Sequence, residues 1–232
     1  MYPQISHWPL LHAAFFHRAP GRLLKVDDDQ QPLVHWKLGE LLGQIHNETR
    51  VYQGPRHRDH WNEERGFVLA RRVQGDPKDP MTRAWREVIQ WLDHLPTDIE
   101  HYGLIHGDAH QGNFFVTDQK EITLFDFDDS QLSWYAYELA IPLFSLLGRE
   151  INGEENPILY EECRESLIDG YLQTQNKRPD WIDWIPKFIE FRTVLLYFWA
   201  QARYQKKDLE PDGLKRIRRM MAWCKARTLA SR

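Results

Sequence analysis

Three short β-type segments lie in the middle of a sequence that otherwise has the hydrophobic periodicity of α-helices. Tyr102–Ile105, Phe114–Thr117 and Glu121–Phe125 are rich in β-branched and aromatic residues and are separated by tight polar turns. Elsewhere apolar residues recur at helical spacing, as Val34 and Leu38 do. Helices are predicted near 33–52, 81–95, 136–148, 158–175, 183–205 and 211–229. The pattern predicts an α+β fold, with a small β hairpin element set into a mainly helical domain.

Two other regions have no helical pattern. Residues 2–16 predict one or two extended segments, punctuated by Pro3 and Pro9. Residues 54–80 are rich in Arg, His, Asp, Gly and Pro, so we expect a long, mostly exposed connection there.

Length and composition exclude several classes of protein. The chain has 232 residues, 42% hydrophobic and 28% charged, which predicts a soluble globular protein of one domain or slightly more. Its two cysteines, Cys163 and Cys224, are too few for a disulfide framework or a thiolate metal site. A net charge of −4 predicts no nucleic-acid or membrane partner. The longest apolar run, Val194–Ala200, is far shorter than the ~18 residues of a membrane span. Residues 1–16 lack the basic start of a signal peptide, so we expect a cytoplasmic protein.

The β element carries an acidic constellation. Asp108 is followed five positions later by Asn113, and Asp126 comes directly after an apolar strand segment. Phosphoryl transfer needs a base that positions the acceptor hydroxyl, together with oxygen ligands for the Mg²⁺ that bridges the nucleotide phosphates. This spacing matches the protein-kinase catalytic loop, except that Gly107 stands where that loop has Arg.

The wider pattern resembles the aminoglycoside phosphotransferase and choline kinase superfamily, near its homoserine-kinase and stress-response-kinase branch. The resemblance rests on the His106–Asn113 motif, on Asp126–Asp129 and on Tyr137–Ala140, and it covers roughly residues 15–205. It implies a protein-kinase-like fold that uses ATP and Mg²⁺. It also implies Asp108 as catalytic base, Asn113 and Asp126 as Mg²⁺ ligands, and three supporting residues. His106 and Glu138 would brace the backbone, and His110 is the third.

Some features depart from the family pattern or are less specific. Glu138 stands where the family usually has Asp. Asp128 and Asp129 are additional acidic candidates, but solvated turn residues explain them equally well. Gly107 replaces the Arg that would hold a phosphorylated activation loop, and the short segment between Asp126 and Glu138 leaves little room for such a loop. We therefore expect a small-molecule hydroxyl acceptor.

Two alternatives explain the same residues without a kinase. Asp108, His110 and Asp126 are also common turn residues in an inert domain. In an extended segment His106, Asp108 and His110 would face one side and ligate zinc, although no second ligand pair is evident. Stoichiometric zinc in the purified protein would favour that second alternative.

The part of a kinase that lies above the phosphates is not evident. The sequence has no Gly-x-Gly-x-x-Gly, and Lys25 is the only lysine before residue 37. By the resemblance, Phe16, His17 and Arg18 belong to the hinge that binds adenine. We therefore expect residues 1–20 to be a remnant of the N-terminal lobe and its sheet, and residues 21–232 to be the helical C-terminal lobe.

Two hypotheses about function remain. One is an ATP-dependent O-phosphotransferase whose activity is impaired by the missing Gly-rich loop and lysine. The other is a noncatalytic pseudokinase or truncated remnant that acts as a binding module. Exposed N-terminal strands would in either case favour a homodimer.

Two surface-type patterns in the C-terminal half are also ambiguous. The aromatic residues between Trp181 and Tyr204 are either core or a cage for a cationic amine, and core is favoured. The basic run Lys215–Arg219 is either a solvated helix face or a site for an anionic partner, and the solvated face is favoured.

Overall fold

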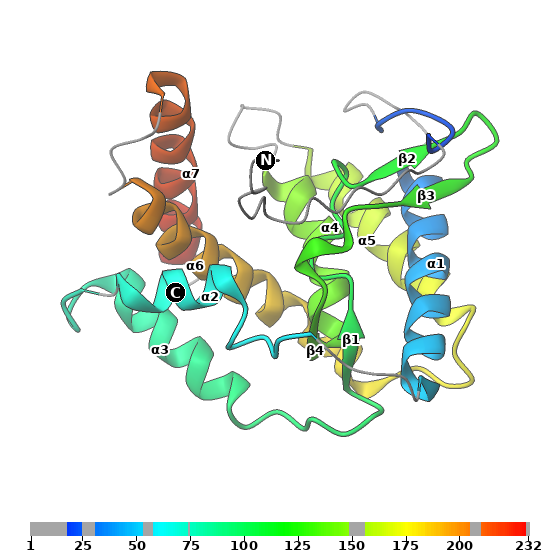
Figure 1. Ribbon diagram of the computed structural model, residues 1–232, viewed down its shortest axis with the longest axis horizontal. Coiled ribbons are helices and arrows are strands. Elements are labelled where there is room, and N and C mark those ends of the chain that lie inside the picture. Colours follow the sequence, from blue (N-terminus) through cyan, green and yellow to red (C-terminus); the bar gives the residue numbers. More distant parts are fainter. Residues whose placement is uncertain are drawn as a thin grey trace, which may run out of the picture.

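The computed structural model describes residues 18–24, 31–52, 58–73, 75–148, 156–204 and 210–230 (Figure 1). Its helices are α1 (Gln31–Val51), α2 (Arg65–Arg72), α3 (Pro80–Leu92), α4 (Tyr135–Leu147), α5 (Pro157–Leu172), α6 (Ile185–Tyr204) and α7 (Pro211–Ala230). Its strands are β1 (Tyr102–Ile105), β2 (Phe114–Val116), β3 (Ile122–Leu124) and β4 (Gln131–Trp134), with short 3₁₀ turns at Phe127–Asp129 and Asp180–Trp184. The mainly helical α+β prediction is confirmed. The extended segments expected in residues 2–16 lie outside the described residues, as does all but 18–20 of the expected N-terminal lobe remnant, residues 1–20.

Local chemistry explains where several helices begin. The Asp79 side chain accepts the Thr82 backbone N–H at 2.9 Å, and Pro80 occupies the first position of α3. The Asn156 side chain caps α5 in the same way. Both caps satisfy backbone donors that would otherwise have no partner, and Pro costs nothing at a position whose N–H is unpaired.

The prediction that 54–80 is a long connection was wrong for part of this segment. Helix α2 spans Arg65–Arg72 and is capped by Glu64, whose carboxylate accepts N–H groups from Gly66 at 2.6 Å and Phe67 at 3.0 Å. Phe67 and Ala70 bury the inner face of α2, which packs against α6. Few buried positions in a short Arg-rich helix leave a weak periodic signal.

The strands form two small antiparallel sheets. The expected hairpin is β2–β3, with Phe114 opposite Leu124. Strand β4 was not predicted, and it pairs with β1 in the register Tyr102↔Trp134 to Ile105↔Gln131. The chain therefore leaves β1 and returns along β4, and the segment between them contains both the β1–β2 loop and the turn after β3.

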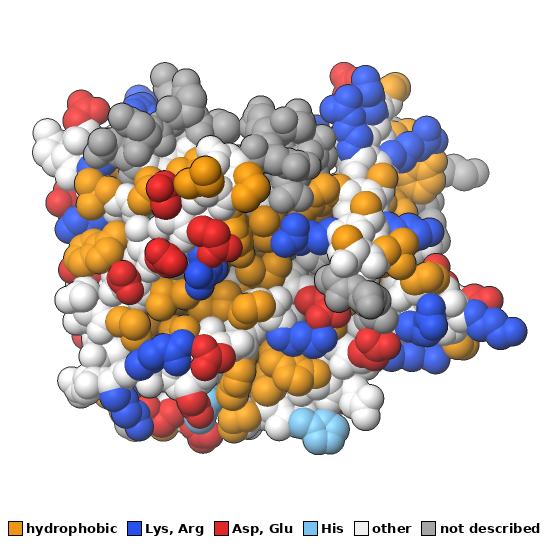
Figure 2. Space-filling model, turned by 180° about the vertical axis from the view of Figure 1, so that it is seen from behind, with side chains coloured by type: hydrophobic (Ala, Val, Ile, Leu, Met, Phe, Trp, Pro, Cys, Tyr) orange, Lys and Arg blue, Asp and Glu red, His pale blue; other side chains and the backbone are white. Residues whose placement is uncertain are grey.

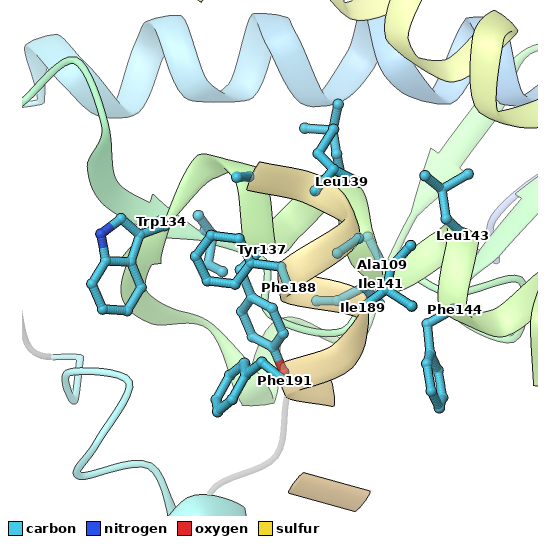
Figure 3. Close-up of a cluster of buried hydrophobic side chains, with 14 of the residues drawn as sticks. Ala109, Trp134, Tyr137, Leu139, Ile141, Leu143, Phe144, Phe188, Ile189 and Phe191 are labelled. Carbon is cyan, nitrogen blue, oxygen red and sulfur yellow. The ribbon is translucent and has the colours of Figure 1, made fainter. Parts of the chain in front are cut away.

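Helix α4 forms the centre of the core. Every residue of α4 except Ser145 is buried, and Figure 3 shows its apolar side chains beside those of α6. Ala109, from the β1–β2 loop, belongs to the same cluster and is fully buried. In Figure 1, α1 and α5 lie at one side of the molecule and α2, α3 and α7 at the other, with α4 and α6 between them. The loop that carries Asp108 is thus anchored in the core on its inner side.

Candidate active site

His106 ties the two turns of the β element together. The ring accepts the Asp108 backbone N–H at Nδ1 (3.3 Å), and Nε2–H donates to the Phe125 carbonyl at 3.0 Å. These partners require the tautomer with hydrogen on Nε2, because Nδ1 must be an acceptor. The ring also packs on Phe127 with a centroid distance of 4.5 Å. His106 therefore fixes the distance between the β1–β2 loop and the turn that carries Asp126.

Gly107 and Glu138 shape the backbone just before Asp108. Gly107 has φ of 83°, and a Cβ there would lie 2.3 Å from the Asp129 carbonyl oxygen, so no larger residue fits. The buried Glu138 carboxylate of α4 accepts the backbone N–H of His106 and, at 3.3 Å, that of Gly107. Although Glu replaces the usual Asp, its side chain reaches the loop and satisfies two buried donors.

Asp108 is held on both carboxylate oxygens. Asn113 Nδ2 donates to Oδ2 at 3.0 Å and to the Asp108 carbonyl at 2.9 Å, and His110 Nε2 lies 3.2 Å from Oδ2. Arg192 Nη2 donates to Oδ1 at 2.6 Å. Burial alone would raise the pKa of Asp108, but the hydrogen bond from His110 and the charge of Arg192 outweigh it and hold that pKa well below its usual range. Asp108 is therefore ionised and oriented at neutral pH.

Arg192 is the residue that sequence reasoning missed. It lies on α6 with 12% of its side chain exposed, and it also donates to the Tyr137 hydroxyl at 3.1 Å. Burial lowers its pKa, but Tyr137 and Asp108 reverse the effect and leave the pKa raised, so the guanidinium keeps its charge. One signal was available: Arg192 is the single charged residue between Phe191 and Ala200.

Asn113 contacts Asp108 directly, and the turn that carries Asp126 lies beside the same loop. Asp126 has left-handed backbone, with φ of 65° and ψ of 63°, a conformation uncommon outside Gly and typical of functional turns. The Phe125 N–H donates to the Asn113 carbonyl at 3.0 Å and so brings the Asp126 turn alongside the β1–β2 loop. No contact between Asp126 and Asp108 is described, but both charges contribute to the raised pKa of Asp129, whose largest cause is burial.

Asn113 and Asp126 both carry side-chain oxygens of the kind that Mg²⁺ prefers. Asn113 directs its amide nitrogen to Asp108, so its amide oxygen remains for a hard cation. Within the described ranges, no group of three or more His, Cys, Asp or Glu is arranged as a metal cage. Mg²⁺ does not need such a cage, because it is usually held by one or two protein oxygens together with phosphates and water.

The structure does not support the zinc alternative. Both ring nitrogens of His106 are engaged by the backbone, and His110 Nδ1 accepts the Gly112 N–H at 2.8 Å. Two of the three side chains proposed for zinc therefore already have partners on the nitrogens that would bind it.

A cavity of about 680 Å³ opens beside Asp108. Its wall includes Gly107, His110 and Asp129, and beyond them residues of α2, α4 and α6. The volume lies in the range of small-molecule sites. Asp128 does not line the cavity, and its carbonyl accepts from Arg58 at 3.1 Å.

The remaining sequence-predicted residues are placed as follows. Arg18 is exposed, and the other hinge candidates, Phe16 and His17, lie outside the described residues. Most aromatic side chains of the Trp181–Tyr204 segment are core, whereas Trp199 lines the cavity. Figure 2 shows Lys and Arg side chains gathered over α7, at the upper right, where Arg218 donates to the Tyr204 hydroxyl. Among the described helices, none is both long enough and apolar enough to cross a membrane.

Comparison with known proteins identifies the family of this chain. Residues 4–181 match the model of the APH family, described as the phosphotransferase enzyme family. An amicoumacin kinase from Bacillus subtilis (strain 168) is 31% identical over 187 residues, which are 78% of this chain and 54% of that protein. The chain thus spans about half the length of the curated relatives it matches.

Solved structures share the fold. The structure of amicoumacin kinase hAmiN in complex with AMP-PNP, Ca²⁺ and Ami has 26% identity and a TM-score of 0.73, covering 91% of this chain and 64% of that one. A microcompartment-associated aminopropanol kinase has 22% identity and a TM-score of 0.64, covering 86% of this chain and 63% of that one. The kinase-like fold inferred from the His106–Asn113 motif is confirmed, and the chain belongs to the phosphotransferase enzyme family.

Proposed function

We propose that this protein is an ATP-dependent O-phosphotransferase that acts on a small hydroxylated molecule. The observation that carries the proposal is the Asp108 carboxylate, which is ionised, held by Asn113 and Arg192, and directed at a small-molecule cavity. The names of the relatives, which include an amicoumacin kinase and an aminopropanol kinase, support a small acceptor.

Each residue then has a defined role. The Asp108 carboxylate accepts a hydrogen bond from the hydroxyl of the substrate and orients the hydroxyl oxygen toward the γ-phosphate. A base of low pKa suffices, because the loose transition state of phosphoryl transfer demands positioning more than early proton removal. His106 and Glu138 hold the loop backbone, and His110 and Arg192 hold the carboxylate.

Asn113 and Asp126 would hold Mg²⁺ through their side-chain oxygens. The bound ion neutralises charge on the nucleotide phosphates. Asp129, on the cavity wall, adds negative charge near that position, whereas Asp128 lies outside the cavity lining and is given no role.

The test is phosphate transfer from radiolabelled ATP to a panel of small alcohols, measured for the wild type, Asp108→Asn and Asp118→Asn. Asp118 is an exposed acid in the β2–β3 turn, so its substitution makes the same chemical change away from the cavity. We expect Asp108→Asn to lose at least about 100-fold in kcat and Asp118→Asn to keep it. Equal activity of the two variants would rule out Asp108 as the base.

A noncatalytic binding module is the second candidate, and the Arg192–Asp108 ion pair favours it because the cation already occupies the carboxylate. The 232 residues also contain no Gly-rich phosphate loop, so we propose that this chain by itself transfers phosphate slowly. A turnover of about 1–100 s⁻¹, the range of ordinary kinases, would contradict that expectation. Nucleotide binding by calorimetry without transfer to any alcohol would favour the binding module.

A further inference from the structure

One face of α6 runs along the cavity from Asp108 outward. Five residues of this face line the cavity: Arg192, Leu195, Leu196, Trp199 and Arg203. The last four follow Arg192 by three, four, seven and eleven positions, which is the spacing of a single helix face. At 1.5 Å of rise per residue, Arg203 lies about 16 Å along the helix from Arg192. The cavity is therefore long, with Asp108 at one end and Arg203 toward the other.

The wall between these ends is apolar and includes an aromatic ring without a partner. Leu69 of α2 and Ile141 of α4 contribute to the same wall. Trp199 is only partly buried, and it is the one tryptophan among the described residues for which no ring or cation contact is found. Large flat rings that face a cavity are common contacts for the apolar body of a ligand.

The acids of the cavity are mostly engaged. Glu64 uses both carboxylate oxygens to cap α2, and Asp108 is paired with Arg192. Asp129 lies beside Gly107, since a Cβ on Gly107 would meet the Asp129 carbonyl oxygen at 2.3 Å, so it belongs to the end of the cavity at Asp108.

Two cations of the cavity are not engaged. Arg203 and Arg65 line the cavity, and neither has a hydrogen bond or ion pair with any described side chain. Unpaired guanidinium groups beside an apolar wall are suited to a carboxylate or another anion, which they bind in a bidentate manner.

We propose that the acceptor is an elongated hydroxylated acid. Its hydroxyl lies at Asp108, its apolar body lies along Leu195 and Trp199, and its anionic group is bound by Arg203, with Arg65 adding positive charge. This inference rests on the proposed phosphotransferase function and specifies its substrate class. It differs from a cationic acceptor, for which the cavity offers no free carboxylate outside the metal end.

The test uses three rigid probes that differ only in charge. Each is a biphenyl with a hydroxymethyl group at one end, and with a carboxylate, a carboxamide or an aminomethyl group at the other. We expect the carboxylate to bind at least about tenfold more tightly than the amine by calorimetry, without nucleotide, so the measurement does not depend on catalysis.

Variants locate the effect. Arg203→Gln should remove the preference for the carboxylate, and Arg203→Lys should keep part of it. Arg71→Gln, on an exposed position of α2 that does not line the cavity, should leave the preference intact. Thermal unfolding of each variant excludes loss of the fold as the cause.

The outcomes separate the two proposals. Tighter binding or faster phosphorylation of the amine would overturn the acidic acceptor while leaving the phosphotransferase in place. Equal affinity for all three probes, or a carboxylate preference that survives in both Arg203→Gln and Arg65→Gln, would also overturn it. Suppose instead that the wild type prefers the carboxylate, that Arg203→Gln loses this preference, and that no probe is phosphorylated. This result would support an acidic ligand and would count only against the proposed phosphotransferase activity.

Discussion

Replacing Arg192 by Met removes the cation from Asp108 while retaining an unbranched apolar side chain. The two groups are 2.6 Å apart, with 12% and 22% of their side chains exposed, so solvent screens them only in part. At that distance and an effective dielectric of about 20, the gross attraction is about 6 kcal/mol. Desolvation of both groups offsets more than half of it, which leaves an expected coupling of about 2–3 kcal/mol.

A double-mutant cycle measures this coupling. Urea unfolding of the wild type, Arg192→Met, Asp108→Asn and the double variant gives four free energies of unfolding. We expect each single variant to be destabilised by about 2–3 kcal/mol, because each leaves a partly buried charge without its partner. The double variant should be less destabilised than the sum.

The control is Arg219→Met, which changes an exposed arginine of α7 and should alter stability by less than about 0.5 kcal/mol. A coupling below about 0.5 kcal/mol, or an Asp108→Asn variant more stable than the wild type, would refute the reasoning. Equal m-values across the set would show that the four unfolding reactions are comparable.

Two of the three further predictions concern the support of the loop, and the third concerns His46, a buried residue of α1. Gly107→Ala places a Cβ 2.3 Å from the Asp129 carbonyl oxygen at positive φ, so it should lower the free energy of urea unfolding by about 2–4 kcal/mol. Gly75→Ala, where the added Cβ meets open space, should change that free energy little, and equal effects of the two variants would contradict the steric argument. Glu138→Gln replaces one acceptor oxygen by a donor facing a loop N–H, so it should cost about 2 kcal/mol and lower kcat. Unchanged stability would show that the carboxylate charge and its second acceptor oxygen are dispensable. Burial lowers the pKa of His46, so the unfolded chain takes up a proton below about pH 6.5 that the folded chain resists. Unfolding free energy of the wild type should therefore fall relative to His46→Gln by at most about 1.4 kcal/mol per pH unit between pH 6.5 and 5, and parallel curves would contradict this.

The helices and the hairpin could be predicted because their signals are local. The helix near 33–52 is observed as Gln31–Val51, and the segments at 102–105 and 114–117 are observed as strands of nearly the same length. The spacing from Asp108 to Asn113 likewise specified a loop in which the two side chains meet. Each of these features depends on residues that are close in the sequence.

The features that were missed depend on distant partners or on weak signals. Strand β4 has no alternation to reveal it, because all of Gln131–Trp134 is buried against β1 and its surroundings. Helix α2 starts with a Glu64 cap, which is not a usual start signal. Arg192 reaches Asp108 across 84 positions of sequence, so only packing of α6 on α4 brings them together.

The β1–β4 ladder closes the base of the segment from His106 to Ser130, since Ile105 pairs with Gln131. Amide protons in this ladder should therefore exchange with solvent only when the whole segment is released. Such an opening would release Asp108 and the two proposed magnesium ligands from the core in one event. The Leu132 N–H donates to the Asp59 carbonyl, so the amides of the neighbouring pair, Gly103 and Ser133, are the suitable probes. Their exchange rates would report how often the segment that carries Asp108 is released under native conditions.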